Sequence, residues 1–120
     1  MKDNKNSINV DLVRAAYKNQ IEEVKHLIKC GADIHFEDDI ALSWAAHDGS
    51  LETVKYLIEC GADIHSKNDK ALMFAVVGGH LETVKYLVEC GADVHADEDC
   101  ALIWAVEEGH LEIAEYLKSL

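Results

Sequence analysis

Apolar residues recur along this chain at a spacing that predicts pairs of short helices. Leu72, Ala75 and Val76 stand three and four positions apart, which places them on one face of a helix. The glycine pair Gly78-Gly79 is expected to end that helix, because glycine interrupts helical patterns. A second apolar series then runs through Leu81–Cys90, with charged residues on its opposite face. The pattern therefore predicts two helices joined by a tight turn.

The same pattern returns every thirty residues. The segments 40–69 and 70–99 are identical at 18 of 30 positions, 100–120 aligns with them without a gap, and 10–39 is a more divergent copy. A fixed period of this size is typical of solenoids, in which each unit packs only on its neighbours. We expect a flexible N-terminal tail at residues 1–9 and one domain at 10–120, made of repeats 10–39, 40–69, 70–99 and 100–120.

Two kinds of residue mark the loops between the expected helix pairs. A glycine follows each of the first three second helices, where a left-handed residue often ends a helix: Gly31, Gly61 and Gly91. An acid or amide precedes each first helix: Asn9, Asp39, Asp69 and Asp99. Such side chains are favoured N-caps, and an acid also suits the positive end of the helix dipole. We therefore expect these residues to cap the first helices.

Several motifs at fixed places in the unit point to a known family. They are Gly79-His80-Leu81-Glu82, Val84-Lys85, Leu87 and Gly91-Ala92-Asp93-Val94, with echoes at Gly49-Ser50-Leu51-Glu52, Gly61-Ala62-Asp63-Ile64 and Gly109-His110-Leu111-Glu112. This pattern resembles the ankyrin repeat, whose usual unit has about 33 residues. The unit here is shorter, and the chain has no proline for the usual Thr-Pro-Leu-His segment. Such thirty-residue units are similar to the short ankyrin repeats of large DNA viruses of amoebae.

The resemblance implies a fold and a role. The fold is an all-α ankyrin-repeat solenoid of about four helix–turn–helix repeats, with the β-hairpin fingers shortened or absent. The role is a non-enzymatic protein–protein interaction module that binds its partner on the concave face of the stack. We expect no cofactor and no catalytic residue. Ser43, His47 and Asp48 lie close in sequence, but no cleft or oxyanion donor is evident beside them.

Composition narrows the class of partner. The chain is 49% apolar, which argues against disorder, and its net charge of −12 disfavours nucleic acid, whose phosphates need a basic surface. The sequence has no stretch long and apolar enough for a membrane span, and its first nine residues lack a signal-peptide core. We expect a monomer in the cytoplasm, or in the host cytoplasm if the chain is viral. Its partner would be a protein with a basic surface, or one indifferent to charge.

Aligned aromatic residues mark the expected first helices. Trp44, Phe74 and Trp104 occupy one position of the repeat, and polar residues follow one helical turn later. The resemblance places the end of the first helix on the concave side, which would make the aromatics a groove floor with an acid-rich rim. The alternative is that they pack between repeats, as helically spaced aromatics usually do. The candidate contact residues are Arg14, Tyr17, Lys18, Trp44, His47, Asp48, Phe74, Val77, Trp104, Glu107 and Glu108.

Cysteine and histidine also recur with the repeat, which leaves a second class of function open. The recurring residues are Cys30, Cys60 and Cys90, and His35, His65 and His95. Stacked helices lie about 8–10 Å apart, too far for disulfides between equivalent positions, so reduced thiols are expected. A metal ladder is conceivable, but one tetrahedral zinc needs four clustered ligands, and loop histidines that bond nearby backbone are the simpler interpretation. A third possibility is an acidic decoy that occupies the nucleic-acid-binding surface of another protein.

Overall fold

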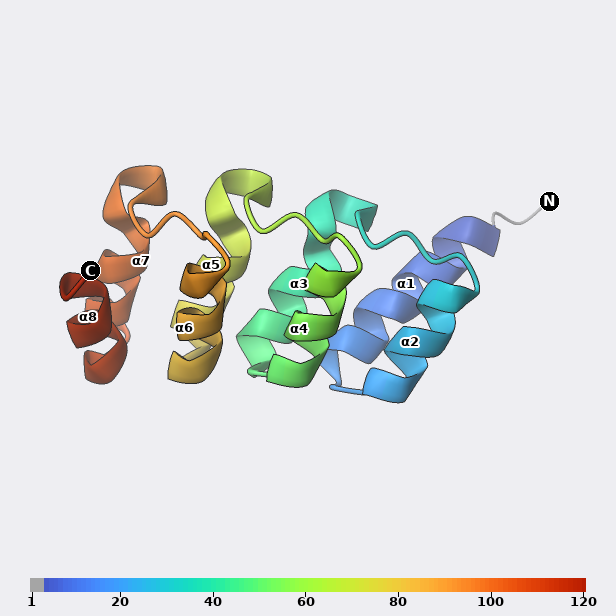
Figure 1. The fold of residues 1–120 in the computed structure, drawn as a ribbon, viewed down its shortest axis with the longest axis horizontal. Coiled ribbons are helices and arrows are strands. Elements are labelled where there is room, and N and C mark those ends of the chain that lie inside the picture. Colours follow the sequence, from blue (N-terminus) through green and yellow to red (C-terminus); the bar gives the residue numbers. More distant parts are fainter. Residues whose placement is uncertain (1–3) are drawn as a thin grey trace.

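Four helix pairs stand side by side in the computed structural model, which describes residues 4–120 (Figure 1). The stack measures 50 × 24 × 22 Å, and no strand occurs between residues 4 and 120. The predicted all-α solenoid is therefore confirmed. The helices are α1 (Asn4–Tyr17), α2 (Ile21–Lys29), α3 (Phe36–Asp48), α4 (Leu51–Glu59), α5 (Ser66–Gly78), α6 (Leu81–Glu89), α7 (Ala96–Glu107) and α8 (Leu111–Lys118).

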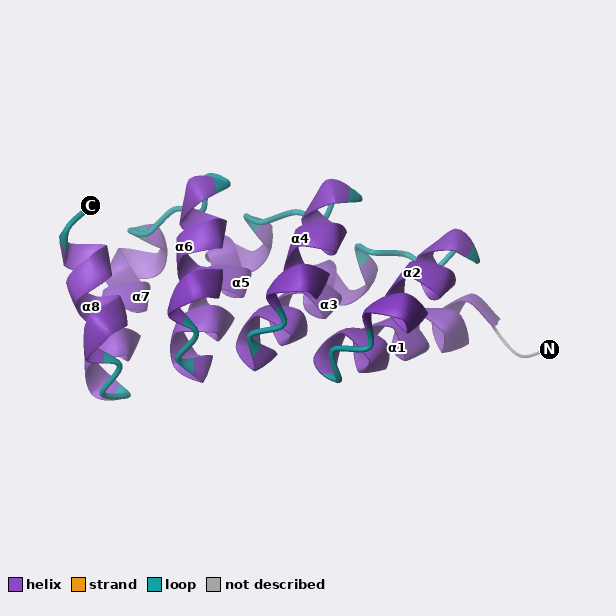
Figure 2. Cartoon of the chain, turned by 60° about the horizontal axis from the view of Figure 1, so that its bottom comes forward, coloured by secondary structure: helices purple, strands orange, loops and turns teal. Residues whose placement is uncertain are grey.

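The helices form two rows. The first helices of the pairs, α1, α3, α5 and α7, make one row, and α2, α4, α6 and α8 make the other (Figure 2). Successive first helices pack against one another much more extensively than successive second helices do. Small side chains allow this, because the central positions of the first helices are fully or almost fully buried alanines: Ala15, Ala45, Ala75 and Ala105.

A continuous apolar core fills the space between the rows. Each pair adds equivalent residues to it, such as Leu72 from α5 and Val84 and Leu87 from α6, all at most 1% exposed. The interior is packed as the repeat predicted, with the core extended one unit at a time.

The first helix begins earlier than expected. The sequence suggested a tail over residues 1–9, but α1 starts at Asn4. Ile8 packs against the core and Asn9 is buried, so tertiary contacts hold this segment in the helix. Residues 1–3 of the expected tail lie outside the described residues.

Glycines end the helices where the sequence predicted. Gly91 follows α6 with φ +103°, and the amide of Ala92 donates a hydrogen bond to the carbonyl of Leu87 across it, 2.9 Å away. Gly78, at the end of α5, serves a different need. A Cβ at this position would lie 2.2 Å from the carbonyl oxygen of His47, so only glycine lets α5 come this close to α3.

The prediction that acids cap the first helices is wrong. Asp39 has φ +62°, outside the extended region in which an N-cap residue sits. Left-handed turns precede the right-handed part of α3, α5 and α7 at residues 37–39, 67–69 and 97–99. The Asp39 carboxylate instead accepts the backbone N–H of Asp63, 2.8 Å away in the next loop. Both oxygens of this carboxylate also lie close to Nδ1 of His35 in the preceding loop, Oδ2 at 3.0 Å and Oδ1 at 3.2 Å.

This arrangement recurs as a series that we call the loop staples. Oδ2 of Asp69 accepts the N–H of Asp93 at 2.7 Å, and Oδ1 of Asn9 accepts the N–H of Asp33 at 2.7 Å. Asp39 and Asp69 are each 5% exposed, so their hydrogen bonds are protected from water. Asp99 differs, because its side chain is 55% exposed and pairs with His95, without a hydrogen bond to a following loop.

Core packing gives the first prediction. Leu72→Ala should lower the free energy of unfolding by about 2–5 kcal/mol, because it leaves a cavity between α5 and its neighbours. Leu111→Ala is the matched control: this leucine is 66% exposed, and its loss should change stability by less than about 0.5 kcal/mol. Urea unfolding followed by circular dichroism measures both, and equal losses would contradict the proposed core.

The loop staples give the second prediction. Asp69→Ala should cost about 1–3 kcal/mol of unfolding free energy, because the N–H of Asp93 loses an acceptor that is itself buried. Asp69→Asn should retain most of the stability, since Asn9 performs the same task in the first pair. Asp99→Ala, at the exposed equivalent, should have little effect. If Asp69→Ala and Asp99→Ala were equally harmful in urea unfolding, the staples would not be stabilising.

The third prediction concerns the loop histidine of the last unit. A hydrogen bond to Asp99, helped by the charge of that carboxylate, raises the pKa of His95 above its usual value. Protonated His95 therefore favours the folded state below the ordinary histidine pKa of about 6.5, and this contribution is lost as pH rises through the folded pKa. An NMR titration should show His95 keeping its proton to higher pH than it does in the Asp99→Asn variant. Coincident titration curves would refute the contact.

Candidate functional site

Aromatic rings from three successive first helices form a continuous series on one face. The Trp44 ring of α3 lies 5.3 Å from the Tyr17 ring of α1 and 5.3 Å from the Phe74 ring of α5, both edge-to-face. His47, one turn after Trp44, lies 5.5 Å from the Trp44 ring and 6.2 Å from Phe74. Such geometry is the favoured one for aromatic pairs, so the series is a packed and ordered surface.

Two hollows open beside these rings, and together we call them the aromatic groove. One, of about 210 Å³, is lined by Val13, Arg14, Tyr17 and Trp44. The other, of about 290 Å³, is lined by Trp44, His47, Met73, Phe74, Val77 and Trp104. Trp44 is thus the wall shared by both. The second hollow spans three units, from α3 to α7.

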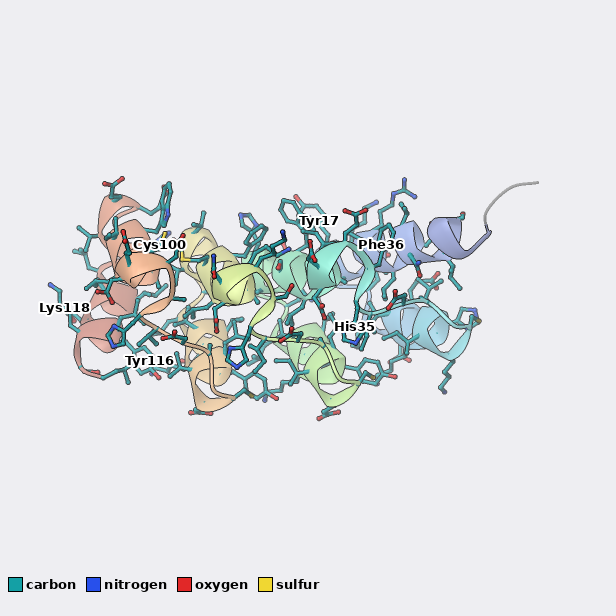
Figure 3. The ribbon with its side chains drawn as sticks, turned by 90° about the horizontal axis from the view of Figure 1, so that it is seen from above. Tyr17, His35, Phe36, Cys100, Tyr116 and Lys118 are labelled. Atoms are coloured by element: carbon teal, nitrogen blue, oxygen red, sulfur yellow. The ribbon has the colours of Figure 1, made fainter. Side chains whose placement is uncertain are left out.

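The groove lies on the first-helix side of the molecule. Figure 3 shows Tyr17 on the outer edge of the first-helix row, whereas Tyr116 lies among the second helices. Tyr17 is 47% exposed and Trp104 is 39% exposed, while Trp44 and Phe74 are half-buried. The two interpretations of the aromatics are therefore compatible, since one edge packs against a neighbouring unit and another edge faces solvent. Their use by a partner stays a prediction.

The helix pairs and the glycine-ended turns agree with a comparison to known families. The family model described as "Ankyrin repeats (3 copies)" matches residues 12–98 and, in an overlapping match, residues 42–120. The chain belongs to the ankyrin-repeat family. No curated protein matches it significantly.

The ankyrin-repeat family has a general role in binding other proteins. Ankyrin repeats are, in general, modules for protein–protein interaction, and the proteins that contain them are typically non-enzymatic. None of the helices between residues 4 and 120 has the length and apolar character of a membrane span.

The ankyrin fold gathers some of the predicted contact residues and separates others. Those lining the groove are Arg14, Tyr17, Trp44, His47, Phe74, Val77 and Trp104. The others are exposed outside the lining: Lys18, Asp48, Glu107 and Glu108. Two of the predicted contact residues have partners nearby in the sequence. Arg14 pairs with Asp11 at 3.5 Å, and the carboxylate of Asp48 accepts a hydrogen bond from the Ser50 hydroxyl, with 2.9 Å between the two oxygens.

Sequence reasoning missed two lining residues, Val13 and Met73. Each precedes a predicted contact residue by one position, so the signal was present in their place within the repeat. The equivalent residue of the second unit, Ser43, is buried, so this position lines a hollow in some units and not in others. The walls of a hollow depend on which neighbour leaves space, and a single repeat cannot show that.

The histidines of this ankyrin chain have structural roles, though not all as predicted. His35 and His65 bond the carboxylates of the loop staples, where backbone partners were expected. The His80 ring lies over Gly49, and the His110 ring lies over Gly79 with its Nε2 3.2 Å from the carbonyl of Val77. Among the described residues, no three histidine, cysteine or acidic side chains are grouped so as to hold a metal ion. All four cysteines are free thiols.

The second-helix face shows a contrasting use of aromatic rings. Each of three tyrosines has a lysine of the preceding unit over its ring: Lys25 on Tyr56 at 5.5 Å, Lys55 on Tyr86 at 5.3 Å and Lys85 on Tyr116 at 5.7 Å. Hydrogen bonds to the neighbouring cysteines, together with burial, raise the pKa of Tyr56 and of Tyr86. These contacts connect successive second helices, so the rings on this face are already occupied.

Proposed function

We propose that this chain binds a partner protein on the concave face of its ankyrin stack, with the aromatic groove as the central contact. The observation that carries the proposal is the series of ordered rings, packed on one edge and exposed on the other, around a hollow of about 290 Å³. Rigid aromatic side chains are the usual anchors of protein interfaces, because they bury much apolar area at little entropic cost.

The architecture supports this surface as a recognition site. Trp44 and Phe74 are half-buried and pack edge-to-face on each other, so these walls of the groove are ordered without a partner. A preformed site loses little conformational freedom on binding. The rim residues Asp48, Glu107 and Glu108 would then contribute orientation and association rate more than affinity, since exposed charges are screened.

Removal of a groove wall gives the fourth prediction. Trp104→Ala should weaken partner binding by about 2 kcal/mol, or about 30-fold, because a central aromatic anchor is lost. It should also lower the free energy of unfolding by about 2–3 kcal/mol, less than the loss of a fully buried tryptophan, because the ring is 39% exposed. Binding is therefore compared under conditions in which circular dichroism shows the variant to be folded. Trp44→Ala should also reduce binding, with a larger loss of stability because its ring touches two neighbours.

The measurement is a pull-down from the source cell, followed by calorimetric titration of the captured protein against each variant. Leu111→Ala is the matched control, because it removes an exposed apolar side chain from the same unit on the other row. If Trp104→Ala lost helicity and binding in equal measure, the tryptophan would be a core residue only. Unchanged binding by the Trp44/Trp104 double variant would place the interface elsewhere.

A further inference from the structure

The second hollow of the groove has aromatic walls with no cation of the chain's own. Trp44, Phe74 and Trp104 line it, and within the described residues the cation–π contacts all lie on the second-helix tyrosines. Lysines thus lie over the rings on one side of the molecule, whereas between residues 4 and 120 no lysine or arginine lies over the rings of the hollow, whose mutual contacts are edge-to-face. The face of an aromatic ring is electron-rich and attracts a cation.

The charges around this hollow favour a cation as well. His47 and Val77 lie within the last two residues of α3 and α5, so the hollow is next to helix C-termini, which carry partial negative charge. Glu107 and Glu108 are exposed one turn beyond Trp104. The groove's basic residue Arg14 lines the other hollow, on α1. The net charge of −12 adds a long-range attraction for basic partners.

The size of the hollow limits its occupant. At about 290 Å³ it lies at the lower bound of sites for small ligands, which suits one long side chain better than a whole cofactor. A guanidinium group is planar, stacks on aromatic rings and is more weakly hydrated than an ammonium group. An arginine therefore fits both the walls and the surrounding charge.

We propose that the hollow between Phe74 and Trp104 receives a cationic side chain, arginine in preference to lysine, from a basic segment of the partner protein. This inference rests on the proposed function and names the chemistry that the groove recognises. Glu107 and Glu108, at the C-terminal end of α7, belong to this end of the groove, and Arg14 and Lys18 belong to the α1 end. The partner's basic residue would therefore lie toward α7.

A random peptide library tests the proposal without a known partner. Twelve-residue peptides displayed on phage are selected on the full chain, and the pool is screened against the Trp104→Ala variant to retain those that need the groove. We expect the retained peptides to be enriched in arginine over the unselected library, and a lack of enrichment would overturn the cationic occupant. A retained peptide that contains arginine is then synthesised with this residue unchanged, replaced by lysine, and replaced by norleucine, which keeps an apolar chain without charge. The arginine peptide should bind about tenfold more tightly than the norleucine peptide, with the lysine peptide between them.

A pair of variants at one position isolates the charge. Val77→Lys places a cation in the hollow, and Val77→Glu places an anion of similar length there. The arginine peptide should lose about tenfold in affinity for Val77→Lys relative to Val77→Glu, because only the lysine repels it. Glu52→Gln, at an exposed position of α4, changes the net charge by the same amount as Val77→Lys. It should leave binding nearly unchanged.

The outcomes separate this inference from the proposed function. Arginine dependence together with the expected order of the Val77 variants supports both. Groove-dependent peptides that bind equally well with norleucine would overturn the cationic occupant and leave the protein-binding groove in place. If every selected peptide bound the Trp104→Ala and Val77 variants as well as the unaltered chain, both proposals would be refuted.

Discussion

Close packing between successive first helices supports every other feature of this molecule. Ala45, Ala75 and Ala105 are completely buried, and their small side chains let α3, α5 and α7 approach one another. The same approach requires Gly78, where a Cβ would meet the backbone of α3. Trp44 and Phe74 each stand one position before one of these alanines, and their half-buried rings pack on each other across α3 and α5. The aromatic groove is thus a direct result of how the scaffold packs.

The loop staples show how a short ankyrin unit manages without hairpin fingers. The buried carboxylate of Asp39 contacts His35 in the loop before α3, and it accepts the N–H of Asp63 in the loop after α4. It therefore connects two successive loops. Each left-handed turn costs conformational energy, and the buried hydrogen bonds offset it. The loops are therefore held in register by side chains that the sequence suggested as helix N-caps.

Much of the fold could be predicted from the sequence because its determinants are local and repeated. The spacing of Leu72, Ala75 and Val76 was enough to predict α5, and Gly91 ended α6 as expected. The role of Asp69 was not predictable, because its backbone partner Asp93 lies 24 residues away. The left-handed turn that ends at Asp69 also contains no glycine, the residue that usually indicates such a turn in a sequence. Aromatic positions at the candidate site followed from the alignment of the units, but the volume between them depends on tertiary packing.

The lysines over the tyrosines give the two sides of the stack different evolutionary freedom. On the second-helix side, a change at Lys55 alters a contact with the next unit, so each residue constrains another across the boundary. On the first-helix side, Trp104 is 39% exposed, and the exposed part of its ring is not used in a contact with another unit. Specificity can therefore change by a single substitution at Trp104 more readily than at Trp44, whose ring packs on Tyr17 and Phe74 in the neighbouring units.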